Sequence, residues 1–150
     1  MKVAILSGTV YGTAEDVARH AAAKLKAAGF DAWHDPRAQL PQILDFGPQA
    51  LLVVTATTGM GELPDNFIPL YSAIRDQVPA WQGMLGGVIA LGDASYGDTF
   101  CGGGELIREL YAELGMRETQ EMLRLDASET VTPESDAEPW LERFAAALRG

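Results

Sequence analysis

Two nearly uninterrupted apolar runs constrain the fold of this chain more than any other feature of its sequence. The runs are "ALLVVTA" at Ala50–Ala56 and "GVIAL" at Gly87–Leu91. A strand with one face in water alternates apolar and polar residues, whereas a strand buried on both faces does not. Strands of the second kind occur mainly in parallel sheets that helices cover on either side. The two runs therefore predict an α/β protein built on a parallel sheet.

Shorter patterns predict the remaining elements of such a sheet. Three further strands are expected at Val3–Leu6, at Asp31–His34 on an edge, and at Met122–Leu125. Apolar residues at helical spacing predict helices at Thr13–Ala28, from near Asn66, at Gly104–Leu114, and at the end of the chain. Ser135 and Glu138 have capping-box spacing and are expected to open that last helix. The pattern predicts a doubly wound, five-stranded parallel sheet in three layers.

Size, composition and charge indicate one soluble globular domain that spans residues 1–150. The formal net charge of −10 speaks against nucleic acid and anionic membranes as partners, because both are bound through Lys and Arg. No apolar segment is long enough to span a bilayer, and the first residues lack the pattern of a secretory signal. We therefore expect a cytoplasmic protein. Its single cysteine, Cys101, excludes an internal disulfide.

Three loops rich in Gly, Ser and Thr follow three of the predicted strands. They are Ser7–Glu15, Thr57–Asn66 and Gly92–Gly103, and none contains Lys or Arg. In a doubly wound sheet, ligands bind beyond the carboxyl ends of the strands. We therefore expect the ligand among these loops, although an ordinary glycine-rich turn remains the alternative for the first of them.

The first loop has donors that could bind one phosphate without a cation. These donors are the hydroxyls of Thr9 and Thr13 and the N–H groups from Val10 to Ala14, at the start of a helix. A nucleoside triphosphate site of the P-loop kind would need a lysine in this loop. The dinucleotide fingerprint G-x-G-x-x-G is also absent. The loop predicts a single phosphate held by neutral donors.

The other two loops suit a flat ring. Tyr96 lies in a glycine-rich turn between aspartates, where its ring could stack on a planar ligand or pack on its own loop. Thr58-Gly59-Met60 offers a conformationally free peptide beside a polarisable side chain. One phosphate and one flat ring describe a mononucleotide with a large planar head.

The three loops resemble the motifs of the flavodoxins, which are FMN-binding electron carriers. The segments "SGTVYGTAE", "TATTGMGELPDN" and "LGDASYGDTFC" occur in the family's order and spacing, and the similarity extends over essentially all 150 residues. The chain looks most like the short, stand-alone MioC-like branch, and it also resembles the FMN domains of diflavin reductases. The resemblance implies a flavodoxin-like sheet with strand order 2-1-3-4-5, and FMN as the cofactor.

The resemblance also implies a role for individual residues. Thr9–Ala14 would surround the phosphate, Tyr96 would stack on the isoalloxazine ring, and the Thr58-Gly59-Met60 backbone would lie near the flavin N5. Asp93, Phe100 and Cys101 would line the pyrimidine and ribose side. The full set of expected cofactor-binding residues is Thr9, Val10, Tyr11, Gly12, Thr13, Ala14, Thr57, Thr58, Gly59, Met60, Gly92, Asp93, Tyr96, Phe100 and Cys101.

These features predict a low-potential one-electron carrier rather than an enzyme, with no catalytic residue. Reduction adds negative charge to the flavin, and acidic residues near the loops would disfavour that charge. The acidic residues are Glu62, Asp65, Asp93 and Asp98. No metal site is expected, because His20 and His34 lie far apart in the sequence and lack supporting Cys or Asp residues.

By resemblance, the partners are a NAD(P)H-dependent flavodoxin reductase with a basic surface and acceptor redox proteins, which dock electrostatically onto a monomer. Two alternatives remain open. The same fold serves flavin-dependent NAD(P)H or quinone reductases, and it could also serve a flavin-binding accessory or regulatory protein.

Overall fold

The fold places a parallel sheet between two layers of helices. The computed structural model describes residues 1–58, 61–92, 101–126, 129 and 132–150. The strands are β1 (Lys2–Gly8), β2 (Asp31–His34), β3 (Ala50–Thr55), β4 (Leu85–Gly92), β5 (Arg117–Glu118) and β6 (Leu123–Asp126). The helices are α1 (Thr13–Ala27), α2 (Leu40–Phe46), α3 (Ile68–Gln77), α4 (Gly102–Glu113) and α5 (Pro133–Arg149).

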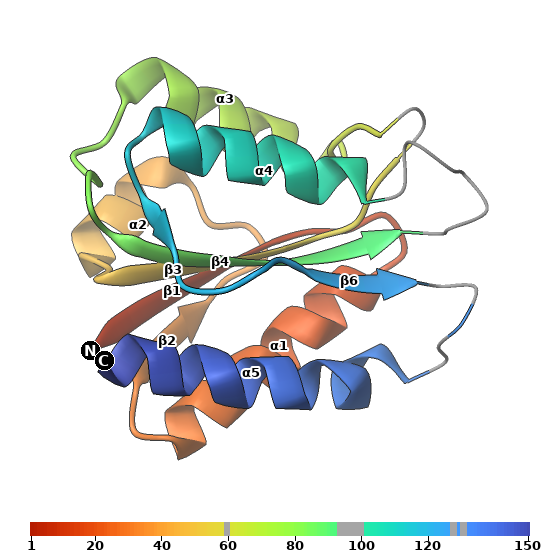
Figure 1. The fold of residues 1–150 in the computed structure, drawn as a ribbon. Coiled ribbons are helices and arrows are strands. Elements are labelled where there is room, and N and C mark those ends of the chain that lie inside the picture. Colours follow the sequence, from red (N-terminus) through yellow and green to blue (C-terminus); the bar gives the residue numbers. More distant parts are fainter. Residues whose placement is uncertain (59–60, 93–100, 127–128, 130–131) are drawn as a thin grey trace.

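The strand order agrees with the prediction. The sheet runs β2-β1-β3-β4-β5, β6 also pairs with β4, and each of these strand pairs is parallel. α1 and α5 cover one face of the sheet, whereas α2, α3 and α4 cover the other (Figure 1). The doubly wound α/β fold in three layers is therefore confirmed.

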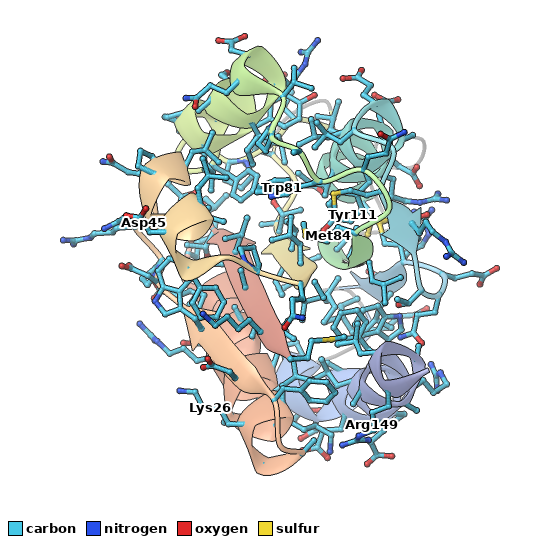
Figure 2. The ribbon with its side chains drawn as sticks, turned by 90° about the vertical axis from the view of Figure 1, so that its left-hand side faces the viewer. Lys26, Asp45, Trp81, Met84, Tyr111 and Arg149 are labelled. Carbon is cyan, nitrogen blue, oxygen red and sulfur yellow. The ribbon has the colours of Figure 1, made fainter. Side chains whose placement is uncertain are left out.

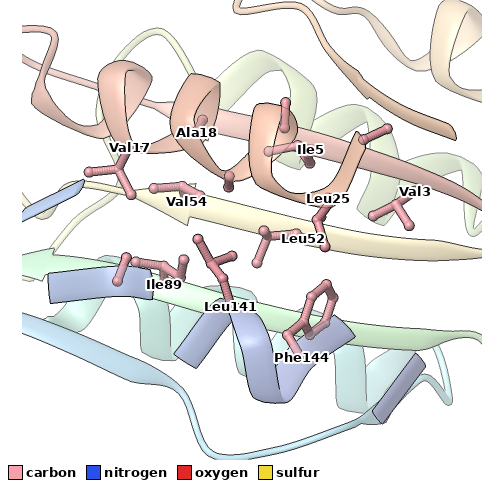
Figure 3. Packing of buried hydrophobic residues seen from close by; sticks show 14 of the residues in the cluster. Val3, Ile5, Val17, Ala18, Leu25, Leu52, Val54, Ile89, Leu141 and Phe144 are labelled. Carbon is pink, nitrogen blue, oxygen red and sulfur yellow. The ribbon is translucent and has the colours of Figure 1, made fainter. Parts of the chain in front are cut away.

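Both faces of the sheet are buried, as the uninterrupted apolar runs predicted. On the face toward α1 and α5, strand residues such as Ile5, Leu52 and Val54 pack in one cluster with Leu25 and Leu141 of the helices (Figure 3). The intervening strand residues pack in a second cluster with α2, α3 and α4. Because a one-residue slip would exchange the two clusters, this burial specifies the register of each strand.

The fifth position of the sheet holds two short strands rather than one. Gly86 of β4 pairs with Glu118 of β5, and Ile89 pairs with Leu123 of β6. From Gly86 to Ile89 β4 advances by three residues, whereas the paired chain advances by five from Glu118 to Leu123. Two extra residues therefore bulge out between β5 and β6. The predicted strand Met122–Leu125 corresponds only to the second of these two strands, and β5 was not predicted.

Trp140 of α5 anchors the segment between β5 and β6. Its Nε1 donates to the Glu121 carbonyl at 2.8 Å, and its own carbonyl accepts a hydrogen bond from the Gln120 side chain at 2.9 Å. Trp140 is almost fully buried. The indole therefore both fills the core and satisfies the Glu121 carbonyl in the segment where strand pairing is interrupted.

The last helix begins earlier than the capping-box spacing indicated. α5 starts at Pro133 after the N-cap residue Thr132, so Ser135 lies inside the helix and the capping interpretation is wrong. Proline is favoured in the first turn because a helix leaves that N–H without an intrahelical partner in any case. A capping box does join Gln39 and Gln42 at the start of α2, a helix that the sequence patterns did not predict.

Gly87 of β4 lies against α5 without room for a larger residue. A Cβ atom there would come within 2.7 Å of Phe144 and 2.8 Å of Trp140. These two buried rings stack with their centroids 5.2 Å apart, which leaves them little freedom to move. We expect Gly87→Ala to lower the free energy of unfolding by about 1–3 kcal/mol through overpacking, as measured by urea denaturation.

A double-variant cycle with Phe144→Leu checks the cause of this loss. Adding Gly87→Ala to the Phe144→Leu background should cost less than adding it to the original chain, because the smaller side chain makes room. Equal losses in the two backgrounds would show that the clash with Phe144 is not responsible.

Candidate cofactor-binding site

The described parts of the three predicted loops, residues 7–15, 57–58, 61–66, 92 and 101–103, adjoin the carboxyl edge of the sheet, on the right in Figure 1. The first two are joined by hydrogen bonds from the Ala56 N–H to the Gly8 carbonyl at 2.8 Å and from the Thr9 N–H to Asn66 Oδ1 at 3.1 Å. The second is joined to the start of α4 by a bond from the Gly103 N–H to Thr57 Oγ1 at 3.1 Å. These bonds bring the described ends of the loops to one edge, and the single ligand site expected there stays a prediction.

The first loop ends at the N-terminus of α1, where backbone N–H groups have no acceptor among the described residues. Gly12 is the N-cap of α1 with φ of 92°, and no side chain caps the helix. The Thr9 hydroxyl accepts a hydrogen bond from the Gly12 N–H at 2.7 Å, which closes the loop. Within the described residues, the N–H groups of Thr13 and Ala14 donate to no acceptor. These unpaired donors at the positive end of a helix dipole fit a phosphate group without any lysine.

Two side chains of this loop point into solvent. Tyr11 is 95% exposed and Val10 is 47% exposed, so neither side chain is held against the rest of the chain. Ala14, by contrast, is fully buried beneath the helix start. The loop therefore presents polar backbone on its inner side and an exposed aromatic ring on its outer side.

The second loop closes on itself around residues 59–60. The Thr58 N–H donates to the Glu62 carbonyl at 2.8 Å, and the Glu62 N–H donates to the Thr58 carbonyl at the same distance. A Cβ at Gly103 would lie 2.6 Å from the Ala56 carbonyl oxygen, so this glycine permits the close approach of α4. Gly92, the first residue of the third predicted loop, is the last residue of β4. The remaining predicted residues, Gly59, Met60, Asp93, Tyr96 and Phe100, lie outside the described residues.

The Cys101 side chain faces the core rather than the edge of the sheet. It is fully buried, and its Sγ lies 3.6 Å from the Ala90 carbonyl oxygen. Burial raises the pKa of this thiol to about 11, although the nearby Arg124 acts in the opposite direction. The thiol is therefore protonated and a poor nucleophile at neutral pH. Only the backbone of Cys101, the N-cap of α4, remains available to a ligand.

Three polar residues near the first loop were not predicted as site residues. Asn66 accepts the hydrogen bond from Thr9, and Ser7 Oγ lies 2.9 Å from His34 Nε2. Burial lowers the pKa of His34, Glu15 and Asp35 act to raise it, and Arg19 acts to lower it. The signal that could have identified this pair is topological, since Ser7 and His34 stand near the carboxyl ends of the adjacent parallel strands β1 and β2.

The loop edge is acidic, whereas the opposite edge carries basic residues. Helices α1 and α5 begin at the loop edge with Glu15, Asp16, Glu134 and Asp136 and end at the opposite edge with Lys24, Lys26 and Arg149. Figure 2 views that opposite edge, with Lys26 and Arg149 at its periphery. Exposed Glu62 and Asp65 add charge to the loop edge. The distribution complements the helix dipoles and makes the molecule electrically polar.

The part of the chain that the structure describes supports neither a metal site nor a membrane-spanning helix. No group of His, Cys, Asp and Glu side chains there is arranged to hold a metal ion. None of the helices there combines the length and the apolar content that crossing a membrane requires.

Comparison with known proteins gives matches over nearly the whole chain. Residues 5–140 match the protein-family model described as Flavodoxin. The chain is 40% identical to Flavodoxin YqcA from Escherichia coli strain K12 over 149 residues, which is 98% of each chain. It is 36% identical to Protein MioC from the same strain over 154 aligned positions, again 98% of each chain.

The structure is also similar to a solved one. It matches the C101A mutant of a flavodoxin from Pseudomonas aeruginosa with a TM-score of 0.97, at 72% identity and with 100% of both chains covered. The likeness thus covers the whole fold, with its sheet and both helical layers.

Gly12 and Gly29 provide a matched test of the first loop. Gly12 precedes α1 and Gly29 follows its C-cap, with φ of 92° and 95°, and a Cβ atom at either would meet no atom within 4 Å. Alanine at either position should cost about 1–2 kcal/mol of stability, because L-residues disfavour positive φ. We expect only Gly12→Ala to weaken the binding of FMN, the cofactor that the sequence resemblance implies, by about tenfold or more.

Urea denaturation without added flavin measures the two stability losses, and quenching of flavin fluorescence measures affinity. If Gly29→Ala weakened FMN binding as much as Gly12→Ala, the first loop would have no special part in binding.

Proposed function

The chain belongs to the flavodoxin family, and from this premise we propose that it is an electron carrier with FMN as its resident cofactor. The observation that carries the proposal is the uncapped start of α1, where Thr13 and Ala14 have N–H groups without an acceptor among the described residues. A phosphate monoester satisfies such donors. Because the site lacks the lysine of a P-loop, it suits one phosphate better than three.

FMN, when bound, supplies the redox chemistry, since its ring accepts and returns electrons. The chain supplies binding and orientation. Thr9 orders the phosphate loop through its bond to Gly12, and Thr57 ties the second loop to α4 through Gly103. These contacts order the first loop and fix the start of the second loop against α4. We extend the proposal to Tyr96 as the stacking residue, on the basis of the sequence resemblance.

We also propose that the acidic loop edge keeps the reduction potential low. Added electrons bring negative charge to a region that already carries exposed Glu62 and Asp65. The arginines at this edge are paired with carboxylates, so their charge does little to offset the repulsion. Arg19 is paired with Glu15 and Asp16, and Arg124 is paired with Glu105.

The same edge supports a proposal about partners. We propose that a NAD(P)H-dependent reductase and acceptor redox proteins dock there through basic surfaces, and that the carrier acts as a monomer. Exposed Val10 and Tyr11 lie at this edge beside carboxylates, and protein interfaces commonly combine an aromatic centre with a charged rim. Docking here would bring a partner close to the loops that hold the cofactor.

The decisive experiment begins with purification and a visible spectrum. We expect a yellow protein that holds about one FMN per chain and is reduced stepwise by dithionite. NADPH alone should leave it oxidised, because no residue of the described site is arranged to bind a nicotinamide. A colourless protein that takes up no FMN would refute the cofactor. Reduction by NADPH alone would favour the reductase alternative, and FMN binding without reversible reduction would favour an accessory role.

Electrostatic docking predicts a strong dependence on salt. Electron transfer from the reduced protein to cytochrome c, a basic redox protein, should slow by about tenfold or more when the ionic strength rises from about 10 mM to 500 mM. Ferricyanide, an anionic acceptor, is the control, and its reduction should become faster with salt. A similar salt response for both acceptors would contradict the docking proposal.

A further inference from the structure

Ser7 and His34 form a hydrogen-bonded pair at the base of the first loop, the proposed phosphate-binding segment. Ser7 is buried, and its Oγ lies 2.9 Å from Nε2 of the half-buried His34. Along β1, Ser7 follows Ile5 by two residues, so both side chains lie on the face that α1 covers. Ser7 is also the last side chain before the Gly8-Thr9 turn. The pair therefore connects the end of β2 to the base of the loop that begins α1.

The direction of this hydrogen bond depends on the charge of His34. A serine hydroxyl has one proton, so it can donate to only one acceptor at a time. If Nε2 of the neutral ring carries no proton, the Ser7 hydroxyl must donate to it. Protonated His34 carries hydrogens on both ring nitrogens and can only donate, which frees the Ser7 proton to point elsewhere. Protonation thus gives the base of the loop both a positive charge and an additional donor.

The groups around His34 act on its charge in opposite directions, and together they favour the neutral ring. Burial lowers its pKa, and Arg19 of α1 acts in the same direction. Glu15 of α1 and the adjacent Asp35 act to raise it. An anion bound at the start of α1 would shift this balance toward the charged ring by Coulomb attraction. No lysine or arginine is present in the three loops to play that part.

We propose that His34 is a positioning residue for the phosphate of the cofactor, which when protonated directs the Ser7 hydroxyl toward that phosphate and adds a positive charge behind it. The inference rests on the proposed FMN-binding function and makes the affinity for the phosphate group depend on pH. By linkage, phosphate binding and His34 protonation must strengthen one another equally.

Histidine titration by NMR tests this coupling directly. The full-length protein is compared in its complexes with FMN and with riboflavin, which has the same ring but no phosphate. We expect the pKa of His34 to be higher in the FMN complex, by about half a unit or more. His20, whose Nε2 lies 3.0 Å from Glu138 Oε1, is the internal control, and its NMR signals should not differ between the two complexes. Identical His34 titrations in the two complexes would overturn the proposal.

Affinity measurements on His34→Gln supply a second readout. Glutamine can retain a hydrogen bond to Ser7 but cannot become charged. At about pH 5.5 the original chain should bind FMN about threefold tighter than the variant, and at about pH 8 the two affinities should agree within about 1.5-fold. Titration of the phosphate itself near pH 6 affects both proteins and cancels in their ratio.

Two controls separate the possible outcomes. Riboflavin should bind the original chain and His34→Gln equally at both pH values, and His20→Gln should behave like the original chain with FMN. If Ser7→Ala removed none of the pH-dependent advantage, the serine would not transmit the effect. If the ratio of the FMN affinities of the original chain and His34→Gln did not change with pH, the role of His34 would be refuted and the proposed function would stand. If neither protein bound FMN, the proposed function itself would be refuted.

Discussion

The burial of the parallel sheet on both faces is the constraint on which the rest of the structure depends. Because all strands point the same way, each strand-to-helix turn must leave the same edge, and the helices that follow must begin there. The apolar side chains of β1 and β3 fix this arrangement in both core clusters. The backbone donors at the start of α1 are thus gathered by packing that never touches a ligand.

The sequence was sufficient to predict the architecture, because its strongest signal is the apolar character of the central strands, whose burial also stabilises the fold. The runs in β3 and β4 lie at the centre of the sheet, where burial leaves no polar alternation. The failures occur where local spacing competes with tertiary contacts. Pro133 starts α5 ahead of Ser135, and the anchoring by Trp140 accompanies a divided fifth strand that periodicity alone could not reveal.

The site likewise has features that the sequence predicts and features that only the folded structure reveals. The loops and their common edge follow from the order of the strands, and the donors of the first loop follow from Gly12 and the helix behind it. The contributions of Asn66 and of the Ser7–His34 pair depend on contacts between segments 57 and 27 residues apart. No spacing rule encodes such contacts, since they arise only when neighbouring strands and loops are brought together by the fold. Cys101 shows the converse, because a residue in a ligand loop can turn its side chain into the core.

The divided fifth strand has a consequence for how this scaffold could grow. β5 and β6 are each secured to β4 by their own register, so the pairing of either strand does not run through the segment that Trp140 anchors between them. Additional residues placed in that interval would project from the margin of the sheet, away from the opposite margin at β2. The interval is therefore an insertion point, where a new segment could be grafted while the central strands keep their alignment.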